Sequence, residues 1–206
     1  MIKFLLIIKN VVHIILAAGP SSRMGTPKQL LPWQGDSLIV NEIKKSLDLK
    51  LVETYVVLGA NFELIEKEIN CYSIHILKNK QWKLGMGSSI NHGIRHLMNN
   101  QVDFDAVLFS LVDQPLIKVQ HLSNLISKFD SNPNRIVATK MKSRIGVPAI
   151  FPKTFCPALS KLEEDFGARY IIEKHKDDLI TIDGGDKTID IDTLEQYNAL
   201  LKREKE

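Results

Sequence analysis

Cysteine is scarce in this chain of 206 residues, which contains only Cys71 and Cys156. The two lie far apart and neither belongs to a C-x-x-C motif, so the sequence predicts neither a disulfide framework nor a thiolate zinc site. Small secreted domains usually depend on several disulfides. The low cysteine content therefore favours a reducing environment, and we expect a cytoplasmic protein.

The chain also lacks a large excess of charge of one sign and a long apolar run. The chain carries 27 Lys and Arg against 24 Asp and Glu, whereas proteins that bind nucleic acids usually present a dense basic surface. The apolar run at residues 4–8 stops at Lys9, which makes it shorter than a secretory signal and far shorter than a membrane span. We therefore expect no nucleic-acid partner and no membrane association, and a small anionic ligand is compatible with this charge.

Internal repeats, linkers and low-complexity segments are lacking as well. A chain of this length and composition is typical of one globular domain. We expect a single domain over residues 11–206, with residues 1–10 as an N-terminal extension or a leading strand.

Apolar runs alternate with stretches of helical periodicity along most of the chain. Runs rich in β-branched residues predict strands at 11–17, 52–58, 73–77, 106–112 and 135–139, with shorter strands at 147–151 and 179–182. Apolar spacing near 3.6 predicts helices at 38–47, 62–69, 88–98, 119–129, 166–174 and 194–201. Strands that alternate with helices are typical of crossover units, so the expected fold class is α/β with a mainly parallel sheet.

The loop after the first strand, residues 19–28, combines glycines and serines with two cations, Arg23 and Lys28. Glycines let a backbone fold closely with its N–H groups turned inward, and the hydroxyls and cations add donors for phosphate oxygens. The loop matches neither the P-loop nor the G-x-G-x-x-G pattern. It is therefore interpreted either as a phosphate-binding loop or as a surface turn whose basic side chains are solvated.

Two aspartates are candidate metal ligands. Asp113 follows the strand at 106–112 and precedes Gln114-Pro115, so its carboxylate is placed where a divalent cation could bridge to bound phosphates. Asp192 follows Asp190 near the C-terminus and could complete that site. Each has a plainer interpretation as the residue that caps the next helix.

Residues 16–28 read L-A-A-G-P-S-S-R-M-G-T-P-K. This string resembles the signature loop of the MobA-like nucleotidyltransferases, L-A-[AG]-G-x-S-x-R-M-G-x-x-K, and is most similar to the molybdenum cofactor cytidylyltransferase branch. Further segments similar to that branch follow in the expected order, at 79–82, 85–90, 113–115, 146–151, 165–169 and 190–195. The resemblance favours the phosphate-binding interpretation of the loop.

The resemblance implies a Rossmann-like fold, with a mainly parallel sheet and helices on both faces, that transfers a nucleotide. In the implied reaction, a terminal phosphate of molybdenum-bound molybdopterin attacks the α-phosphorus of CTP, and pyrophosphate leaves. Such a transfer depends on positioning and charge neutralisation more than on covalent catalysis. The implied partners are CTP or GTP, a molybdopterin-type substrate and a molybdenum hydroxylase that receives the product.

Carried over residue by residue, the resemblance assigns catalysis to Lys28, Arg23 and Asp113, with Lys28 neutralising the α-phosphate. It assigns Mg²⁺ to Asp113 and Asp192. The nucleotide-binding positions it implies are Leu16, Ala17, Ala18, Gly19, Ser21, Arg23, Gly25, Lys28, Asn79, Gly87 and Ser88. The positions implied for the acceptor are Gly146, Pro148 and Arg169.

Ala18 carries the choice of nucleotide, because the guanylyltransferase branch usually has glycine at this position. A methyl group there leaves room for a pyrimidine and crowds a purine, although one methyl changes binding by only ~1–3 kcal/mol. Leu194 and Gln196 depart from the usual closing motif D-T-P-E-D, and Gly87 replaces a common serine. We therefore expect CTP, with GTP as the alternative.

Two other functions are compatible with the sequence. One is a guanylyltransferase or cytidylyltransferase that acts on another phosphate acceptor, such as a sugar or an isoprenoid. The other is a non-catalytic carrier that binds the finished molybdenum cofactor and delivers it. The joint presence of Lys28 and Asp113 weighs against the carrier, which would need neither for turnover.

Overall fold

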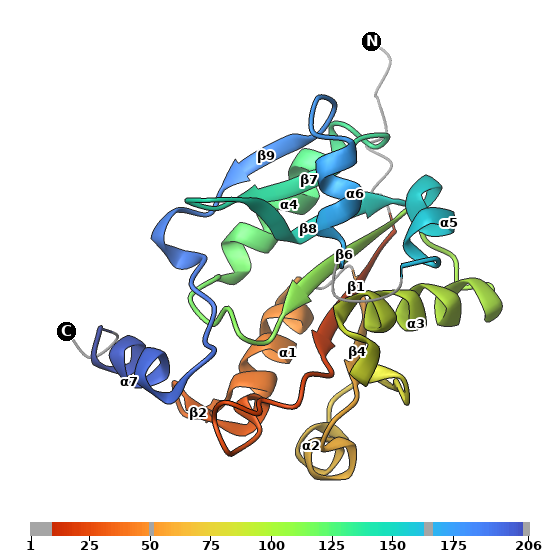
Figure 1. Cartoon of the computed structure of the whole chain (residues 1–206). Helices are drawn as coiled ribbons and strands as arrows, with labels where there is room; N and C mark the ends of the chain where they lie inside the picture. The colour runs from red at the N-terminus through yellow and green to blue at the C-terminus, as the bar shows by residue number, and fades with distance from the viewer. Residues whose placement is uncertain (1–9, 50–51, 163–166, 204–206) are drawn as a thin grey trace.

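The computed structural model describes residues 10–49, 52–162 and 167–203. Its centre is a seven-stranded sheet with the order β5-β4-β1-β6-β8-β7-β9 (Figure 1). The strands are β1 Val11–Ala17, β4 Val52–Leu58, β5 His75–Lys78, β6 Ala106–Leu111, β7 Val137–Lys140, β8 Ile145–Pro152 and β9 Ile180–Asp183, and a small separate hairpin contains β2 Pro32–Trp33 and β3 Asp36–Ser37. The helices are α1 Leu38–Asp48, α2 Phe62–Ile69, α3 Met86–Asn99, α4 Val119–Asp130, α5 Cys156–Leu159, α6 Arg169–Lys174 and α7 Leu194–Arg203.

The sheet is parallel except around β8. The pairs β5–β4, β4–β1, β1–β6 and β7–β9 are parallel, whereas β8 runs antiparallel to both β6 and β7. A tight turn joins β7 to β8, in which the N–H of Met141 donates to the carbonyl of Arg144 at 2.8 Å. So short a connection can only join antiparallel neighbours. The expected α/β fold with a mainly parallel sheet is confirmed.

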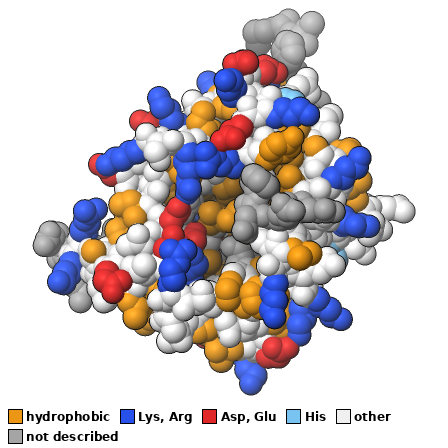
Figure 2. Space-filling view, viewed as in Figure 1, with side chains coloured by type: hydrophobic (Ala, Val, Ile, Leu, Met, Phe, Trp, Pro, Cys, Tyr) orange, Lys and Arg blue, Asp and Glu red, His pale blue; other side chains and the backbone are white. Residues whose placement is uncertain are grey.

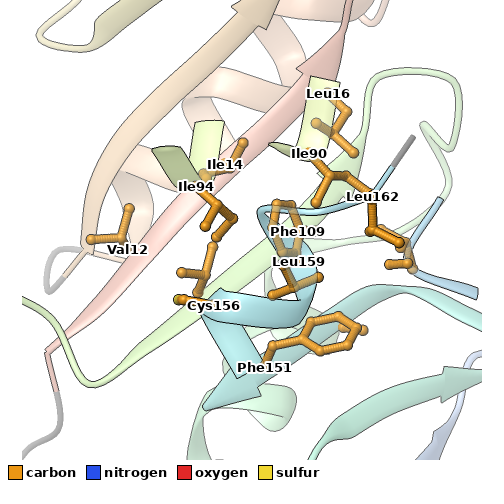
Figure 3. Close-up of a cluster of buried hydrophobic side chains, with 14 of the residues drawn as sticks. Val12, Ile14, Leu16, Ile90, Ile94, Phe109, Phe151, Cys156, Leu159 and Leu162 are labelled. Atoms are coloured by element: carbon orange, nitrogen blue, oxygen red, sulfur yellow. The ribbon is translucent and has the colours of Figure 1, made fainter. Parts of the chain in front are cut away.

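Helices cover both faces of the sheet (Figure 1). Alternating side chains of β1 point to opposite sides, as in any strand. Ile14 and Leu16 pack on the face covered by α3, α5 and α6, and Figure 3 shows this cluster with Ile90 and Leu159. Ile15 and Ala17 pack on the other face with α1, α2 and α7, and α4 covers the neighbouring part of that face. Burial on two faces explains why the strand sequence is apolar at all positions but one.

Some elements differ from the sequence-based expectations. The helix expected at 166–174 is described from Arg169, and residue 166 lies outside the described residues. The expected extension or leading strand at 1–10 also lies outside them, apart from Asn10. The hairpin β2–β3 and the four-residue helix α5 were not predicted, because elements this short carry no periodic signal. Within the described residues, no helix is long and apolar enough to cross a bilayer.

One polar residue interrupts the apolar pattern of β1. His13 is fully buried, and its Nδ1 and Nε2 lie 2.6 and 2.8 Å from the hydroxyls of Ser46 and Ser110. Burial, together with the nearby positive charge of Lys45, lowers the pKa of His13 to about 3. The ring is therefore neutral at neutral pH and at mildly acidic pH.

We predict an acid-dependent loss of stability through His13. The folded state keeps the ring neutral below the ordinary histidine pKa of about 6.5, whereas the unfolded state takes up a proton there. Unfolding then binds protons, so the free energy of unfolding should fall by up to about 1.4 kcal/mol per pH unit as pH drops below about 6.5. Urea unfolding of wild type and His13→Asn at pH 7 and pH 5 measures this slope.

The control is His175→Asn, which removes a histidine at an exposed position. The prediction is wrong if the wild type and His13→Asn lose the same free energy of unfolding between the two pH values.

Candidate active site

A cleft opens where β1 and β6 end side by side. The register pairs Leu16 with Leu111, so the loops that follow both strands leave the same edge of the sheet. The chain continues from β1 toward β4 on one side while β6 lies on the other, and ligands of open α/β sheets bind at such a switch point. The cleft has a volume of about 380 Å³ and is lined by Leu16, Ala17, Ala18, Gly19, Pro20, Arg23, Lys28, Gln29, Trp82, Gly85, Met86, Ser89, Leu111, Val112, Asp113 and Asp192.

The loop from β1 to α1 folds around the side chain of Gln29. This residue is fully buried, and its amide nitrogen donates to the carbonyls of Ala17 and Gly19 at 2.8 and 2.9 Å. Its amide oxygen accepts from Ser21 Oγ at 3.3 Å, and Ser21 Oγ in turn accepts from the backbone N–H of Lys28 at 2.9 Å. The buried amide of Gln29 thus connects the start of the loop to its end and fixes the backbone position of Lys28.

Lys28 reaches across the cleft to the aspartates. Its Nζ lies 2.6 Å from Asp113 Oδ2, 3.5 Å from Asp192 Oδ1 and 3.2 Å from the carbonyl oxygen of Ile191. The Lys28 and Asp113 side chains are 14% and 17% exposed, so their attraction is only partly screened by water. The structure thus brings together three of the residues that the sequence singled out, from segments far apart in the chain.

The surroundings of Asp113 favour a bound cation. Burial raises the pKa of its carboxyl group, Lys28 opposes this rise, and the negative charges of Asp190 and Asp192 add to it. Asp113 Oδ1 is buried and has no hydrogen-bond partner among the described residues. In Figure 2 acidic side chains lie between basic ones at the centre of the face shown, beside a hollow.

A divalent metal fits this donor set in part. Carboxylate oxygens suit hard cations, and one buried oxygen of Asp113 is free to accept one. The described residues contain no group of three or more His, Cys, Asp or Glu side chains arranged for a metal. Asp113 and Asp192 therefore supply two protein ligands at most, and bound phosphates would have to supply others.

Asp190 attaches the C-terminal segment to the end of β6. Its carboxylate accepts from Gln114 Nε2 at 2.8 Å and from Arg144 Nη2 at 2.5 Å. The backbone N–H of Ile191 also donates to the carbonyl of Asp113 at 2.9 Å. These contacts hold Asp192 next to Asp113.

The structure excludes the interpretation of Asp192 as a helix cap. The N-terminus of α7 is capped by Thr193, whose hydroxyl accepts from the N–H of Gln196 at 3.3 Å. Gln196 Oε1 accepts in return from the N–H groups of Thr193 and Asp192 at 3.1 and 2.7 Å, which completes a capping box. The side chain of Asp192 is therefore not used as the cap, and Gln196 has a structural role at this departure from the usual motif.

Trp82 and Ala18 both line the cleft, and both lie close to Gly59. A Cβ atom at Gly59 would lie 2.5 Å from Trp82 Cβ and 2.8 Å from the carbonyl oxygen of Ala18. Only glycine therefore lets the end of β4 pass between these two residues. The width of the cleft at this point depends on that close approach.

Several predicted nucleotide-binding residues do not line the cleft. Asn79 is buried, its amide nitrogen donating to Ser88 and Ser89 while its oxygen accepts from the N–H of Gln81. Ser88 Oγ donates toward the carbonyls of Gln81 and Gly85. Ser21 and Gly25 shape the loop between β1 and α1, both with positive φ, and Gly87 lies buried in the first turn of α3. These residues organise the loops around the cleft.

The three residues predicted for the acceptor also lie outside the cleft lining. Gly146 and Pro148 are buried in β8, where the carbonyl of Pro148 accepts from Thr139 Oγ1. Arg169 is 60% exposed and pairs with Glu173 on the next turn of α6. Residues 165 and 166 of the same motif lie outside the described residues.

A second, larger groove of about 730 Å³ runs beside α3. It is lined by Gln81, Leu84, Ser88, Asn91, His92, Arg95, His96, Asn99, Asn100 and Leu162. Among the described residues that line it there is no carboxylate and neither Arg23 nor Lys28, whereas cations and carboxylates line the smaller cleft together.

Sequence reasoning missed Gln29, Gln114 and Asp190 as organising residues, although all three lie within or next to the motifs. Their roles depend on contacts with distant segments, such as the contact between Gln114 and Asp190. One signal was available for two of them, because Gln29 directly follows Lys28 and Gln114 directly follows Asp113.

Comparison with known proteins places the chain in a family. A model of the "MobA-like NTP transferase domain" matches residues 13–179. The chain is 32% identical to nicotine blue oxidoreductase of Paenarthrobacter nicotinovorans and 26% identical to the purine catabolism protein PucB of Bacillus subtilis, covering 93% of this chain and 96% of each relative. It is 32% identical to a probable molybdenum cofactor guanylyltransferase of Rhodopirellula baltica over 60% of this chain and 58% of that protein.

Solved structures agree on the fold. The crystal structure of Rv0371c from Mycobacterium tuberculosis superposes with a TM-score of 0.79 at 19% identity, covering 94% of this chain and 98% of the other. Its homolog from Mycobacterium sp. strain JC1 gives a TM-score of 0.78 at 26% identity, covering 94% and 96%.

We predict that Asp190→Ala destabilises the protein and releases the C-terminal segment. Gln114 is 1% exposed and its amide oxygen already lacks a partner among the described residues, so loss of Asp190 would leave its amide nitrogen unpaired as well. A buried polar group without a partner costs about 1 to 3 kcal/mol. Chemical unfolding measures the loss.

Asp186→Ala is the matched control, because Asp186 pairs with Lys142 in a fully solvated contact, 81% exposed on both sides, and such pairs contribute little. Equal effects of the two substitutions would contradict the role given to Asp190.

Proposed function

We propose that this chain, which belongs to the MobA-like NTP transferase family, transfers CMP from CTP to a phosphate of molybdenum-bound molybdopterin. As a nucleotidyltransferase it uses a nucleoside triphosphate, and pyrophosphate is the leaving group. The observation that carries the proposal is the contact between Lys28 and Asp113 in the cleft at the ends of β1 and β6.

The reaction requires charge neutralisation at one phosphorus. An oxygen of the acceptor phosphate attacks the α-phosphorus, the bond from that phosphorus to the bridging β-phosphate oxygen breaks, and pyrophosphate takes the electron pair. No bond to the protein forms, so the protein contributes orientation and electrostatic stabilisation. A cleft with convergent cations and carboxylates supplies both.

Lys28 is the residue assigned to the α-phosphate. Its backbone stands at the end of the loop that Gln29 and Ser21 hold, and its side chain lines the cleft. Arg23 and the backbone of Gly19 line the same cleft and bind the remaining phosphates. Ser21 and Gly25 support this loop without lining the cleft.

Asp113 and Asp192 are the residues assigned to Mg²⁺. The free buried oxygen of Asp113 and the exposed side of Asp192 suit a hard cation. When bound, the ion would neutralise phosphate charge during the transfer. The two carboxylates also position Lys28, which contacts both of them.

Ala18 and Trp82 are assigned to the base. Ala18 is buried, and both Ala18 and Trp82 line the cleft. The methyl group of Ala18 reduces the space for the base, which favours a pyrimidine over a purine. Asn79 and Ser88 hold the backbone of Gln81 beside Trp82 and act on the base through that loop, and Gly87 follows the same loop in the first turn of α3.

The acceptor is the least constrained part of the proposal. Relatives that match nearly the whole chain are named for nicotine blue reduction and oxidation chemistry and for purine catabolism, and a shorter match is named for the molybdenum cofactor. The sequence motifs of the cytidylyltransferase branch favour molybdopterin as acceptor and a molybdenum hydroxylase as the receiver of the product. Gly146, Pro148 and Arg169 remain proposed acceptor positions on the strength of those motifs.

We predict pyrophosphate release from CTP in the presence of molybdenum-loaded molybdopterin and Mg²⁺, and loss of release with EDTA. A panel of CTP, GTP, ATP and UTP, each with and without acceptor, separates the nucleotides. Sugar and isoprenoid phosphates in place of molybdopterin test the other acceptor classes.

The outcomes distinguish the alternatives. Binding of the cofactor without pyrophosphate release from any triphosphate would favour a carrier. If no triphosphate is consumed but a reduced nicotinamide dinucleotide is oxidised with nicotine blue, the transferase proposal is wrong.

We predict that Lys28→Met slows pyrophosphate release by about 10²- to 10³-fold, the effect of removing one group that stabilises charge in a transition state. Single-turnover kinetics measure the rate. Lys78→Met is the control, because Lys78 pairs with Glu63 on the surface and lies outside the cleft. An unchanged rate for Lys28→Met would contradict its assignment.

We predict that Ala18→Gly shifts the ratio of kcat/KM for CTP over GTP toward GTP by roughly 10-fold, since one methyl group in a pocket changes discrimination by about 1 to 3 kcal/mol. The ratio is an internal control, because a general loss of activity affects both nucleotides. A ratio that does not move would remove Ala18 from the choice of base.

A further inference from the structure

A buried polar network lies on the α1 face of the sheet, behind the cleft. Its side chains come from four elements and are all less than one-tenth exposed: Glu42, Lys45 and Ser46 on α1, His13 on β1, Thr54 on β4 and Ser110 on β6. Glu42 and Lys45 form an ion pair, with Glu42 3% exposed. None of these residues lines the cleft, and the proposed reaction uses none of them.

The hydrogen bonds of the network run in one direction. Ser110 Oγ donates to Glu42 Oε1 at 2.6 Å, so it must accept from His13 Nε2–H at 2.8 Å. His13 Nδ1 then accepts from the hydroxyl of Ser46, and Ser46 Oγ accepts from the hydroxyl of Thr54 at 2.7 Å. Every hydroxyl has one proton, so the carboxylate of Glu42 at the end of the network fixes the direction of all the other hydrogen bonds.

The ion pair contacts both ends of the segment that carries Asp113. Glu42 bonds Ser110, three residues before Asp113. Lys45 Nζ donates to the carbonyl of Ile117 at 2.9 Å, four residues after it. Between these anchors the N–H of Ile117 closes a turn onto the carbonyl of Gln114. A displacement of either anchor would move the carboxylate between them.

The same helix is tied to the loop that carries Lys28. The N–H of Leu38, the first residue of α1, donates to the carbonyl of Leu31 at 2.9 Å, and Leu31 N–H donates to the carbonyl of Lys28. Helix α1 therefore holds Lys28 through its N-terminus and the Asp113 segment through Glu42 and Lys45. The 2.6 Å contact across the cleft joins two segments that share this helix.

Stability does not explain a buried ion pair of this kind. Removing two charges from water costs several kcal/mol per ion, and apolar side chains of similar volume often stabilise a protein as well as the pair or better. A pair that makes specific contacts to two backbone segments can instead fix their relative position.

We infer that Glu42 and Lys45 are positioning residues that hold Asp113 in place for the reaction, acting through Ser110 and the carbonyl of Ile117. The reactive role of Asp113 rests on the proposed function. The positions of residues 110–117 do not, and they can be tested separately.

The test is the double variant Glu42→Leu/Lys45→Met, which replaces the pair by apolar groups of similar volume. We expect cooperative folding, with a melting transition within roughly 8 °C of wild type. Amide hydrogen exchange should speed up by at least about tenfold at residues 111–117 and stay unchanged in β1 and β4. The kcat of pyrophosphate release should fall about 10- to 100-fold, as for a displaced catalytic group, with KM for the nucleotide changed less than about threefold.

The control variant is Asp36→Ala/Lys44→Ala. It removes an ion pair that also involves α1 but lies on the surface, with Lys44 49% exposed. We expect neither the exchange of residues 111–117 nor kcat to change in this variant.

Unchanged exchange at residues 111–117 in the folded double variant would overturn the inference, and so would faster exchange throughout the sheet, which indicates a general structural role. If the double variant does not fold, Ser110→Ala is judged by the same two criteria; it removes the link between Glu42 and β6 together with the hydrogen bond that Ser110 accepts from His13, and it keeps the ion pair. If wild type releases no pyrophosphate from any nucleotide, the proposed function fails, while the exchange experiment still decides whether the pair positions this segment.

Discussion

The attraction between Lys28 and the aspartates across the cleft is the interaction on which the site depends. Lys28 and Asp113 belong to loops that follow neighbouring strands, and no covalent or ladder contact joins those loops. At 2.6 Å and with little exposure, the pair is strong enough to hold the loops together. Because its two charges are largely removed from water, other contacts must hold both side chains in position. Gln29 supplies that support on one side of the cleft, and the contacts of Asp190 and the α1 network supply it on the other.

The fold was predictable from the sequence because most elements are long and buried on defined faces. The strand at residues 11–17 is apolar at nearly every position, since helices cover both sides of it. The same reasoning fails for β8, whose direction depends on a four-residue turn that hydrophobic periodicity does not describe. It fails for β2 and β3 because two residues cannot show a period.

The site was predictable where chemistry and motif coincide, and less so where a motif residue supports another residue. Lys28, Asp113 and Asp192 meet as their residue types suggested. Asn79 has the polarity of a ligand-binding residue, yet both the nitrogen and the oxygen of its amide are hydrogen-bonded to Ser88, Ser89 and Gln81. Whether a polar side chain faces a ligand or the protein depends on how many partners lie within reach, and those partners are set by tertiary contacts.

Asp190 and Asp192 show how two similar side chains acquire different tasks. They stand two residues apart on an extended segment, so they begin on the same side of the chain. Both oxygens of Asp190 are taken by Gln114 and Arg144, while Asp192 contacts only Lys28 among the described side chains. Since Thr193 and Gln196 cap α7 without Asp192, the carboxylate of Asp192 remains available in the cleft. The structural acid fixes the segment, and its neighbour can therefore serve a ligand.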